Sequence, residues 1–383
     1  MRPLPFRAPM RTALLVAAVV LAFLVAPLAA TGAEPRIEAA AWYLVGHDGS
    51  VLARDDAARS RAIASITKVM TAVVVLEEAS LSEVVRVPPR VTGAGESSAA
   101  LRAGEELTVA DLVRAMLVPS GNDAADALAL HVGGGSADRF VDLMNAKAAE
   151  LGLTDTVFVN AHGLDERGHV SSARDVTKLV RYALGIPFLR DAMSRETVTL
   201  PGGRTLVTTD DLLASWPPLV GGKTGHTAGA GWSQAAAAAR GGVTVYGTVL
   251  GSPSRGARND ALRELLQYGL SQYRRVQVID HGRVYATAPT GYGQPEVELV
   301  APRSLVRTLR SGRPLLERVL APASLPLPVA AGQRLGRVEI YDGNTLVAAS
   351  NLVSVEAVPD ASLWAKTKWH LSETGKNLWG IVT

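Results

Sequence analysis

Ser65-Ile66-Thr67-Lys68 is the stretch that decides the fold, and it stands directly before the apolar run of residues 69–76. Residues three positions apart lie on one face of a helix, one turn from each other. A helix that begins here would bring the Lys68 amine to the Ser65 hydroxyl. A serine hydroxyl attacks a carbonyl only after a base takes its proton, so this spacing is typical of a nucleophile with its own base. Taken alone, the tetrad is a weak signal, because serine and lysine are common surface residues.

Two more short motifs follow in chain order, Ser120-Gly121-Asn122 and Lys223-Thr224-Gly225. The first comes directly after an apolar segment that Pro119 ends, which is a helix stop signal. Each motif alone is typical of a polar surface, but the three together, in this order, indicate one catalytic site. S-x-x-K, S-D-N and K-T-G form the joint signature of class A β-lactamases and penicillin-binding proteins, and here the middle motif reads S-G-N.

With these residues, the chain resembles the serine D-alanyl-D-alanine carboxypeptidases, the low-molecular-mass penicillin-binding proteins. The likeness includes residues 158–165 and 169–175, which are typical of this carboxypeptidase group rather than of β-lactamases. It extends from residue 40 to residue 273 and more weakly to residue 355. The resemblance implies an α+β fold: a penicillin-binding/β-lactamase-like transpeptidase fold, with an antiparallel sheet and a helical cluster, followed by a small C-terminal β-rich domain. The pattern of the residues agrees, because helical segments lie between strands from distant parts of the chain.

The resemblance also implies the roles of three catalytic residues. Ser65 would attack the carbonyl between two D-alanines, Lys68 would act as its base, and Ser120 would relay a proton to the leaving amine. To serve as a base, Lys68 must have a lowered pKa, through burial or a nearby cation. Lys223 could supply that cation.

Six residues are implied to bind the substrate: Asn122, Lys223, Thr224, Gly225, His226 and Arg258. Asn122 would hold the peptide and Lys68, while Lys223 and Thr224 would face the terminal carboxylate. Gly225 would allow the strand to approach the substrate closely. The backbone N–H groups of Ser65 and His226 would form the oxyanion hole.

Two features of the part of the pocket that would receive the terminal carboxylate have alternative interpretations. Arg258 matches the position of a family arginine thought to act on the terminal carboxylate, and the alternative is an ordinary surface arginine. Some relatives carry an arginine or asparagine pair where this chain has Thr208-Thr209-Asp210-Asp211. The rim of the pocket is therefore expected to differ.

Composition excludes several other classes of protein. The chain has 383 residues, 48% of them hydrophobic and 20% charged, which is typical of a globular protein with more than one domain. It has no cysteine, so disulfides and thiolate catalysis are excluded. A net charge of +3 without a basic, aromatic-rich stripe predicts no nucleic-acid partner. No cofactor and no metal are expected, because His162 and His169 lie in a loop without helical ligand spacing and suit structural roles.

The N-terminus has the pattern of an export signal. Arg2, Arg7 and Arg11 precede an apolar run over residues 12–30, and small residues follow at 31–33. This arrangement predicts a signal peptide over residues 1–33. An uncleaved anchor is the alternative, because a bilayer span needs about 20 apolar residues. Either reading places the catalytic part outside the cytoplasmic membrane, on its outer face, in the periplasm or the cell-wall space.

The remaining chain divides into three predicted parts. Residues 34–274 form the serine D,D-peptidase domain, and residues 275–358, with alternating apolar residues, form the β-rich domain. In the tail, residues 359–383, Trp364 and Leu371 share one helical face, and Lys366 and Lys368 add positive charge. This pattern favours a helix that lies on a membrane surface, although an ordinary packing helix remains possible.

The resemblance implies an exported carboxypeptidase that removes the terminal D-alanine from peptidoglycan pentapeptides through an acyl-enzyme. β-Lactam antibiotics would then be covalent inhibitors. The alternatives are a serine β-lactamase, a D,D-endopeptidase acting on cross-linked peptidoglycan, and a silent penicillin-binding scaffold. A class A β-lactamase needs a deacylating glutamate. Glu150 and Glu166 both lack the Glu-x-x-x-Asn setting expected of such a residue.

Overall fold

A computed structural model of the chain describes residues 18–25, 35–91 and 97–382. These residues divide into two compact units. The larger unit comprises residues 35–273. The second comprises residues 274–382 together with the N-terminal strand over residues 18–25.

The larger unit is built on a five-stranded antiparallel sheet with the order β3-β2-β10-β9-β8. Its strands are β2 (Ala41–Gly46), β3 (Val51–Asp55), β8 (Leu219–Thr227), β9 (Gly231–Arg240) and β10 (Val243–Ser252). A hairpin turn that contains Asp48-Gly49 joins β2 to β3, and Gly241-Gly242 joins β9 to β10. The sheet therefore combines the first strands of this unit with its last ones, which confirms the predicted α+β class.

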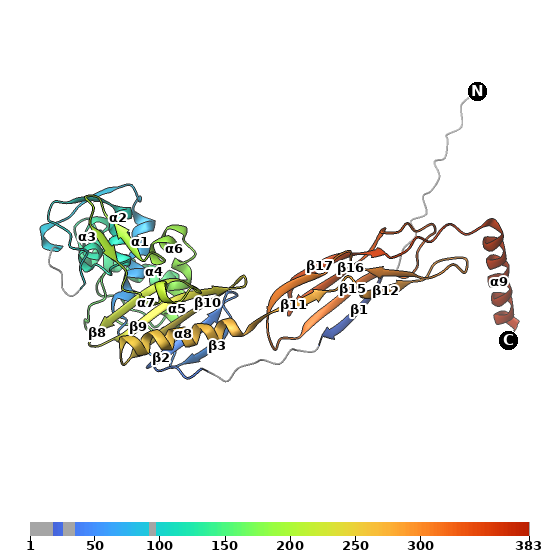
Figure 1. The fold of residues 1–383 in the computed structure, drawn as a ribbon, viewed down its shortest axis with the longest axis horizontal. Helices are drawn as coiled ribbons and strands as arrows, with labels where there is room; N and C mark the ends of the chain where they lie inside the picture. The colour runs from blue at the N-terminus through green and yellow to red at the C-terminus, as the bar shows by residue number, and fades with distance from the viewer. Residues whose placement is uncertain (1–17, 26–34, 92–96, 383) are drawn as a thin grey trace, which may run out of the picture. The chain divides into compact units, whose positions relative to one another are not determined.

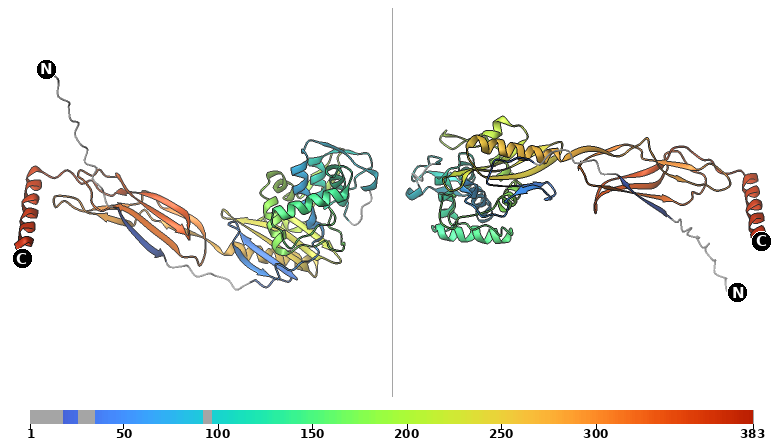
Figure 2. Two further views of the ribbon diagram at one scale, coloured as in Figure 1. Left: turned by 180° about the vertical axis from the view of Figure 1, so that it is seen from behind. Right: turned by 90° about the horizontal axis from the view of Figure 1, so that it is seen from below.

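Helices cover both faces of this sheet (Figures 1 and 2). One face carries α1 (Lys68–Glu78), α2 (Val109–Leu117), α3 (Asn122–Val132), α4 (Ala137–Glu150), α5 (Ala173–Ala183) and α6 (Pro187–Met193). The other face carries α8 (Arg255–Ser271). Leu262, Leu265 and Leu266 of α8 are fully buried with Val245 and Val249 of the sheet. Each helical layer thus buries an apolar side against one face of the sheet.

Shorter elements connect these layers. They are the 3-10 helices η1 (Ala64–Thr67) and η2 (Pro89–Val91), the short helix α7 (Asp211–Ser215), and the strands β4 (Val84–Arg86), β5 (Glu106–Thr108), β6 (Thr197–Thr199) and β7 (Thr205–Val207). Helix α2 is capped at its start by Thr108, whose hydroxyl accepts the Asp111 backbone N–H at 3.1 Å. The helix expected from Ser65 is α-helical only from Lys68, because its first turn is η1.

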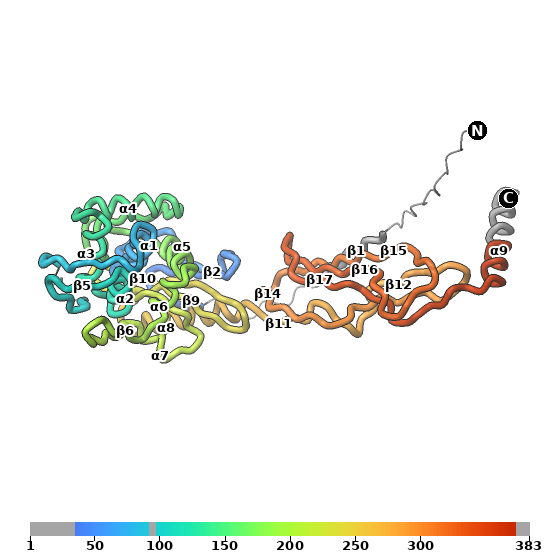
Figure 3. The backbone as a smooth tube through the Cα atoms, turned by 90° about the horizontal axis from the view of Figure 1, so that it is seen from above, coloured from blue at the N-terminus to red at the C-terminus, as the bar shows by residue number. Residues whose placement is uncertain are grey.

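The second unit is β-rich, as predicted. Its main sheet has the order β1-β15-β16-β17-β13-β12. The strands are β1 (Ala18–Val25), β12 (Val284–Ala288), β13 (Val297–Val300), β15 (Leu315–Pro322), β16 (Arg334–Asp342) and β17 (Thr345–Ser354). A separate pair, β11 (Tyr273–Ile279) and β14 (Leu305–Arg310), lies beside this sheet (Figure 3). Leu299, Val338 and Leu352 are fully buried at the centre of the unit.

Most of the predicted signal peptide, residues 1–17 and 26–33, lies outside the described residues. Its central part forms β1, which pairs antiparallel with β15 from Ala18 opposite Pro322 to Val25 opposite Leu315. The sequence pattern did not predict this strand.

The predicted tail helix is present as α9 (Leu363–Val382). Leu363, Trp364 and Leu371 are 85%, 73% and 71% exposed. Trp369 packs edge-on against Tyr292, with ring centroids 5.5 Å apart. No helix among the described residues is long and apolar enough to cross a membrane. Association of the tail with a membrane surface stays a prediction.

Candidate active site

Ser65 and Lys68 lie at the junction of η1 and α1. The single 3-10 turn places Lys68 at the start of α1, with its Nζ 2.9 Å from Ser65 Oγ. Ser65 is half-buried, whereas Lys68 is fully buried. The serine hydroxyl is thus the reachable member of a pair whose amine is shielded from water.

The other partners of Lys68 decide what its amine can do. Nζ lies 2.7 Å from Asn122 Oδ1 and 2.7 Å from the His162 carbonyl oxygen. Both oxygens can only accept hydrogen bonds. A neutral amine has two N–H bonds and one lone pair, so it donates to these two oxygens and presents its lone pair to the Ser65 hydroxyl. This arrangement suits proton removal from Ser65.

Burial and charge favour the neutral amine. Burial lowers the pKa of Lys68 well below its ordinary value, and the nearby Lys223 cation lowers it further. Asp126 and Asp123 act in the opposite direction but do not outweigh these effects. Burial also lowers the pKa of Lys223, to about 7. The two lysines are therefore easy to deprotonate compared with exposed lysines.

Ser120 connects the second motif to the third. Lys223 Nζ donates to Ser120 Oγ at 2.9 Å and to the Thr224 carbonyl at 2.9 Å. Ser120 has a φ of +70°, a conformation that non-glycine residues rarely adopt. At Gly121, a Cβ atom would stand 2.7 Å from the Ala115 carbonyl oxygen. The glycine in the middle of this motif therefore lets the turn between α2 and α3 pack closely.

Strand β8 approaches η1 at Gly225. A Cβ atom on Gly225 would lie 2.8 Å from the Ile63 carbonyl oxygen and 3.2 Å from the Ser65 backbone nitrogen. Any larger residue would push the strand away from the nucleophile. The next residue, His226, is exposed, and its ring stacks on Trp232 with centroids 4.0 Å apart.

A pocket of about 230 Å³ opens over these groups. It is lined by Ser65, Ser97, Ser120, Thr209, Thr224, Gly225, His226, Trp232, Arg255 and Arg258. The other predicted residues, Lys68, Asn122 and Lys223, lie behind it and are joined to it by the hydrogen bonds described above. The structure thus brings all nine sequence-predicted residues to one place. Larger cavities in the β-rich unit, of about 420 and 490 Å³, hold none of these groups.

Arg258 is not an ordinary surface arginine. Its side chain is only 2% exposed, and its Nη2 donates to Asn259 Oδ1 at 2.6 Å. The guanidinium lies 5.9 Å from the centroid of the Trp232 ring. Thr209 lies in the segment expected at the pocket rim, whereas the sequence patterns missed Ser97, Trp232 and Arg255 as pocket residues. Only Arg255 had a usable signal, since it precedes Arg258 by one helical turn.

The two loop histidines support the backbone around Lys68. His169 Nδ1 accepts the Val159 N–H at 3.1 Å, so its Nε2–H donates to Thr67 Oγ1 at 2.7 Å. Burial lowers the pKa of His169 to about 4, which keeps this neutral tautomer near pH 7. His162 contributes its backbone oxygen to Lys68. In the part of the chain that the structure describes, no three potential metal ligands form a group.

Comparison with known proteins identifies the family. Residues 29–254 match the family model Peptidase_S11, described as D-alanyl-D-alanine carboxypeptidase. The chain belongs to this D-alanyl-D-alanine carboxypeptidase family. Residues 273–360 match the C-terminal domain of penicillin-binding protein 5. The enzyme is thus a serine-type D-Ala-D-Ala carboxypeptidase, as the sequence motifs predicted.

Relatives support this membership over most of the chain. The carboxypeptidase DacD of Escherichia coli (strain K12) is 32% identical over 356 residues, which cover 87% of this chain and 90% of that protein. The carboxypeptidase of Streptomyces sp. (strain K15) is 34% identical over 259 residues, covering 62% of this chain and 89% of its own. The crystal structure of penicillin-binding protein 5 from Haemophilus influenzae matches with a TM-score of 0.63 and 27% identity, covering 86% of this chain and all of that one. The predicted penicillin-binding fold is confirmed.

Proposed function

We propose that this enzyme is exported and removes the terminal D-alanine from peptidoglycan pentapeptide stems through an acyl-enzyme on Ser65. The observation that carries the proposal is the buried Lys68 amine beside Ser65. Its two other partners are acceptors, so the lone pair of the neutral amine is directed at the serine hydroxyl. β-Lactams carry an acyl group that the same serine can attack, and they act as covalent inhibitors.

Acylation proceeds in two steps. Lys68 takes the Ser65 proton while Oγ forms a bond to the carbonyl carbon of the penultimate D-alanine. The backbone N–H groups of Ser65 and His226 stabilise the negative oxygen of the tetrahedral intermediate. Ser120, hydrogen-bonded to Lys223, then gives its proton to the amide nitrogen and receives the proton that Lys68 took from Ser65. The C–N bond breaks, D-alanine leaves, and Lys68 is neutral again.

In deacylation, water takes the place of the leaving amine and attacks the ester. Lys68 removes a proton from a water molecule, and the water oxygen attacks the ester carbonyl. The bond to Ser65 Oγ breaks, and the proton returns to the serine. Asn122 holds the peptide and Lys68, while Lys223, Thr224 and Arg258 form the positive end of the pocket that receives the carboxylate. Gly225 permits the backbone of β8 to lie along the substrate.

The chain organisation supports action outside the cytoplasmic membrane. We infer a signal peptide over residues 1–33, a peptidase domain over 34–274, a β-rich domain over 275–358 and a membrane-associated tail over 359–383. The arginines and the apolar run at the N-terminus support export. The exposed apolar side chains of Leu363, Trp364 and Leu371 support attachment to the outer face of the cytoplasmic membrane.

One assay tests the activity. The protein is incubated with diacetyl-Lys-D-Ala-D-Ala and, separately, with a fluorescent penicillin. Release of D-alanine together with a long-lived adduct, both lost in Ser65→Ala, is the expected result. Rapid penicillin turnover without D-alanine release would identify a β-lactamase. Cleavage of cross-linked muropeptides at a higher rate than pentapeptides would identify an endopeptidase, and an adduct without any hydrolysis would identify a silent scaffold.

A further inference from the structure

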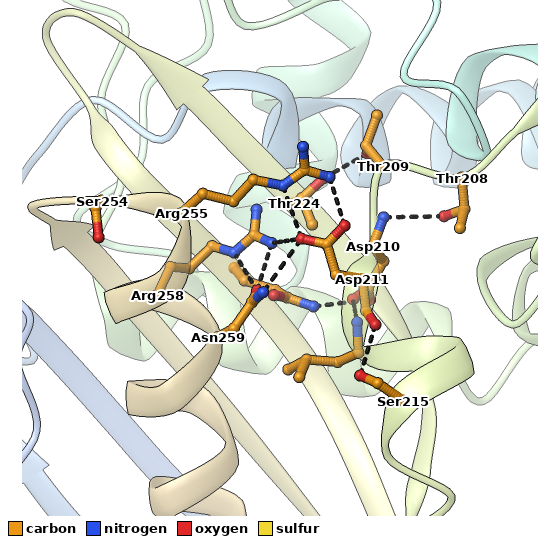
Figure 4. Close-up of polar contacts among 12 residues, drawn as sticks. Thr208, Thr209, Asp210, Asp211, Ser215, Thr224, Ser254, Arg255, Arg258 and Asn259 are labelled. Atoms are coloured by element: carbon orange, nitrogen blue, oxygen red, sulfur yellow. Dashed lines mark hydrogen bonds and ion pairs between the residues drawn. The ribbon is translucent and has the colours of Figure 1, made fainter.

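Two arginines on one helix converge on a single carboxylate at the edge of the pocket (Figure 4). Arg255 and Arg258 lie one turn apart at the start of α8, and both form ion pairs with Asp211, the first residue of α7. Both arginines line the pocket that contains Ser65. Among the described residues that line this pocket there is no aspartate or glutamate, and the two arginines bring positive charge to this part of it.

The contacts of Arg255 leave one edge of its guanidinium unused. Nε donates to Asp211 Oδ2 at 2.7 Å, and Nη2 donates to Asp211 Oδ1 at 2.5 Å. A guanidinium has five N–H bonds in a fixed plane, and this pairing uses only the Nε–Nη2 edge. Nη1 makes no hydrogen bond to any residue that the structure describes. The Nη1–Nη2 edge therefore remains available for a second, bidentate carboxylate.

The side chains of Arg255 and Arg258 differ in how much of their surface is exposed to solvent. The side chain of Arg255 is 51% exposed, whereas that of Arg258 is 2% exposed and already binds Asn259. A ligand can reach Arg255 without any rearrangement of the protein. Thr209 and Thr224 also line this pocket, and their hydroxyls are hydrogen-bonded to each other at 2.6 Å. One of the two hydroxyls accepts this hydrogen bond, and its own O–H can then donate a hydrogen bond to a ligand.

We propose that Arg255 is a further specificity-determining residue, which binds the carboxylate of the departing D-amino acid, and that Asp211 is its positioning residue. This inference rests on the proposed carboxypeptidase function. Asp211 holds the edge of Arg255 that is not offered to the ligand, and its charge offsets the repulsion between two adjacent cations. Without Asp211, the long arginine side chain would have many rotamers to choose from, and ordering it would cost entropy on binding.

Two substrates that differ only in the terminal charge test the role of Arg255. They are diacetyl-Lys-D-Ala-D-Ala and its C-terminal carboxamide. Arg255→Ala should raise the KM for the acid about tenfold, the size of one lost charge-assisted hydrogen bond, and leave the KM for the amide nearly unchanged. The preference for the acid should return in part in Arg255→Lys, which keeps the charge but not the planar fork.

The chain offers a matched control. Arg195 pairs with Asp191 through the same two nitrogens, both at 2.9 Å, and its side chain is 42% exposed, but it does not line the pocket. Arg195→Ala should therefore leave the ratio of the two KM values unchanged. If Arg255→Ala weakens both substrates equally, or neither, or if Arg195→Ala has the same effect, the proposal is wrong.

The role of Asp211 is tested through the same ratio of the KM values for the acid and the amide. Asp211→Ala should reduce the preference for the acid without reducing kcat for the amide, and the double variant with Arg255→Ala should show little further loss. Asp211→Glu should restore part of the preference. An unchanged preference in Asp211→Ala, or equal losses on acid and amide, would exclude a positioning role.

A binding measurement separates this inference from the activity itself. In Ser65→Ala, which cannot be acylated, calorimetry compares binding of the acid and the amide with and without Arg255→Ala. If preferential binding of the acid depends on Arg255 but the wild type releases no D-alanine, the proposed function fails and the assignment of Arg255 stands. If D-alanine is released but the preference for the acid does not depend on Arg255, the proposed function stands and the assignment of Arg255 is wrong.

Discussion

Lys223 Nζ donates a 2.9 Å hydrogen bond to Ser120 Oγ, and this contact joins strand β8 to the turn between α2 and α3. The bond orients the serine hydroxyl from a backbone position that has a positive φ. Because Lys223 occupies the Ser120 oxygen as a donor, the Ser120 proton is free to point toward a leaving group. The second and third motifs therefore act as one unit rather than as separate binding groups.

Removing the Ser120 hydroxyl should impair the departure of D-alanine. We expect Ser120→Ala to lower the rate of Ser65 acylation by roughly a hundredfold or more, the usual contribution of a positioned proton donor. Single-turnover acylation by diacetyl-Lys-D-Ala-D-Ala measures this rate. Ser97→Ala is the control, because Ser97 lines the same pocket and its backbone oxygen, which accepts the Asn122 N–H at 2.8 Å, is kept in alanine. Equal rates in Ser120→Ala and the wild type would rule out the relay.

The pH profile should depend on both lysines. Lys68 works as a neutral base, so kcat/KM should fall as the pH drops through its lowered pKa. Lys223 works as a cation, and its pKa of about 7 means that activity should fall again as the pH rises through that region. The profile should therefore be bell-shaped, with two apparent pKa values that belong to the coupled pair.

Lys223→Arg checks which residue sets the alkaline limb. A guanidinium stays protonated throughout this range, so the variant should keep its activity to a higher pH even if its maximum is lower. Lys178→Arg, on the exposed surface of α5, should leave the profile unchanged. An alkaline limb that does not move in Lys223→Arg would assign that limb to another group.

Gly225→Ala should impair catalysis while the protein still folds. Its Cβ atom would meet the Ile63 carbonyl and the Ser65 nitrogen, so β8 must move away from the nucleophile. We expect acylation by penicillin to fall at least tenfold, because a donor of the oxyanion hole moves with the strand. Gly291→Ala, whose Cβ atom would meet nothing within 4 Å, is the control. Full acylation in Gly225→Ala would show that the close approach is dispensable.

Local spacing made one half of the site predictable. Ser65 and Lys68 lie one turn apart in sequence, so their contact follows from any helical turn, although the turn proved to be 3-10. The order of the three motifs then indicated that Asn122 and Lys223 lie nearby. The family resemblance supplied Arg258 and His226, which no local pattern would have selected.

The other half depends on contacts between distant segments. Asp211 and Arg255 are 44 residues apart, and they meet only because α7 and the start of α8 come together at the pocket edge. Neither residue stands in a pattern that predicts this pairing. The β1–β15 pairing joins segments about 300 residues apart in the same way, and sequence periodicity predicts strands but not their partners.

The exposed face of α9 should bind a membrane surface. Leu363, Trp364 and Leu371 offer apolar side chains to solvent, and Lys366 and Lys368 add charges that attract anionic lipid. The full chain should sediment with vesicles of phosphatidylglycerol and phosphatidylcholine, and the double variant Trp364→Ser with Leu371→Ser should bind at least tenfold more weakly, because insertion of these side chains supplies the apolar part of the affinity. Leu346→Ser, at an exposed position of β17, is the control. If the double variant and this control bind the vesicles as tightly as the wild type, then the tail is an ordinary surface helix and attachment to the membrane must lie elsewhere.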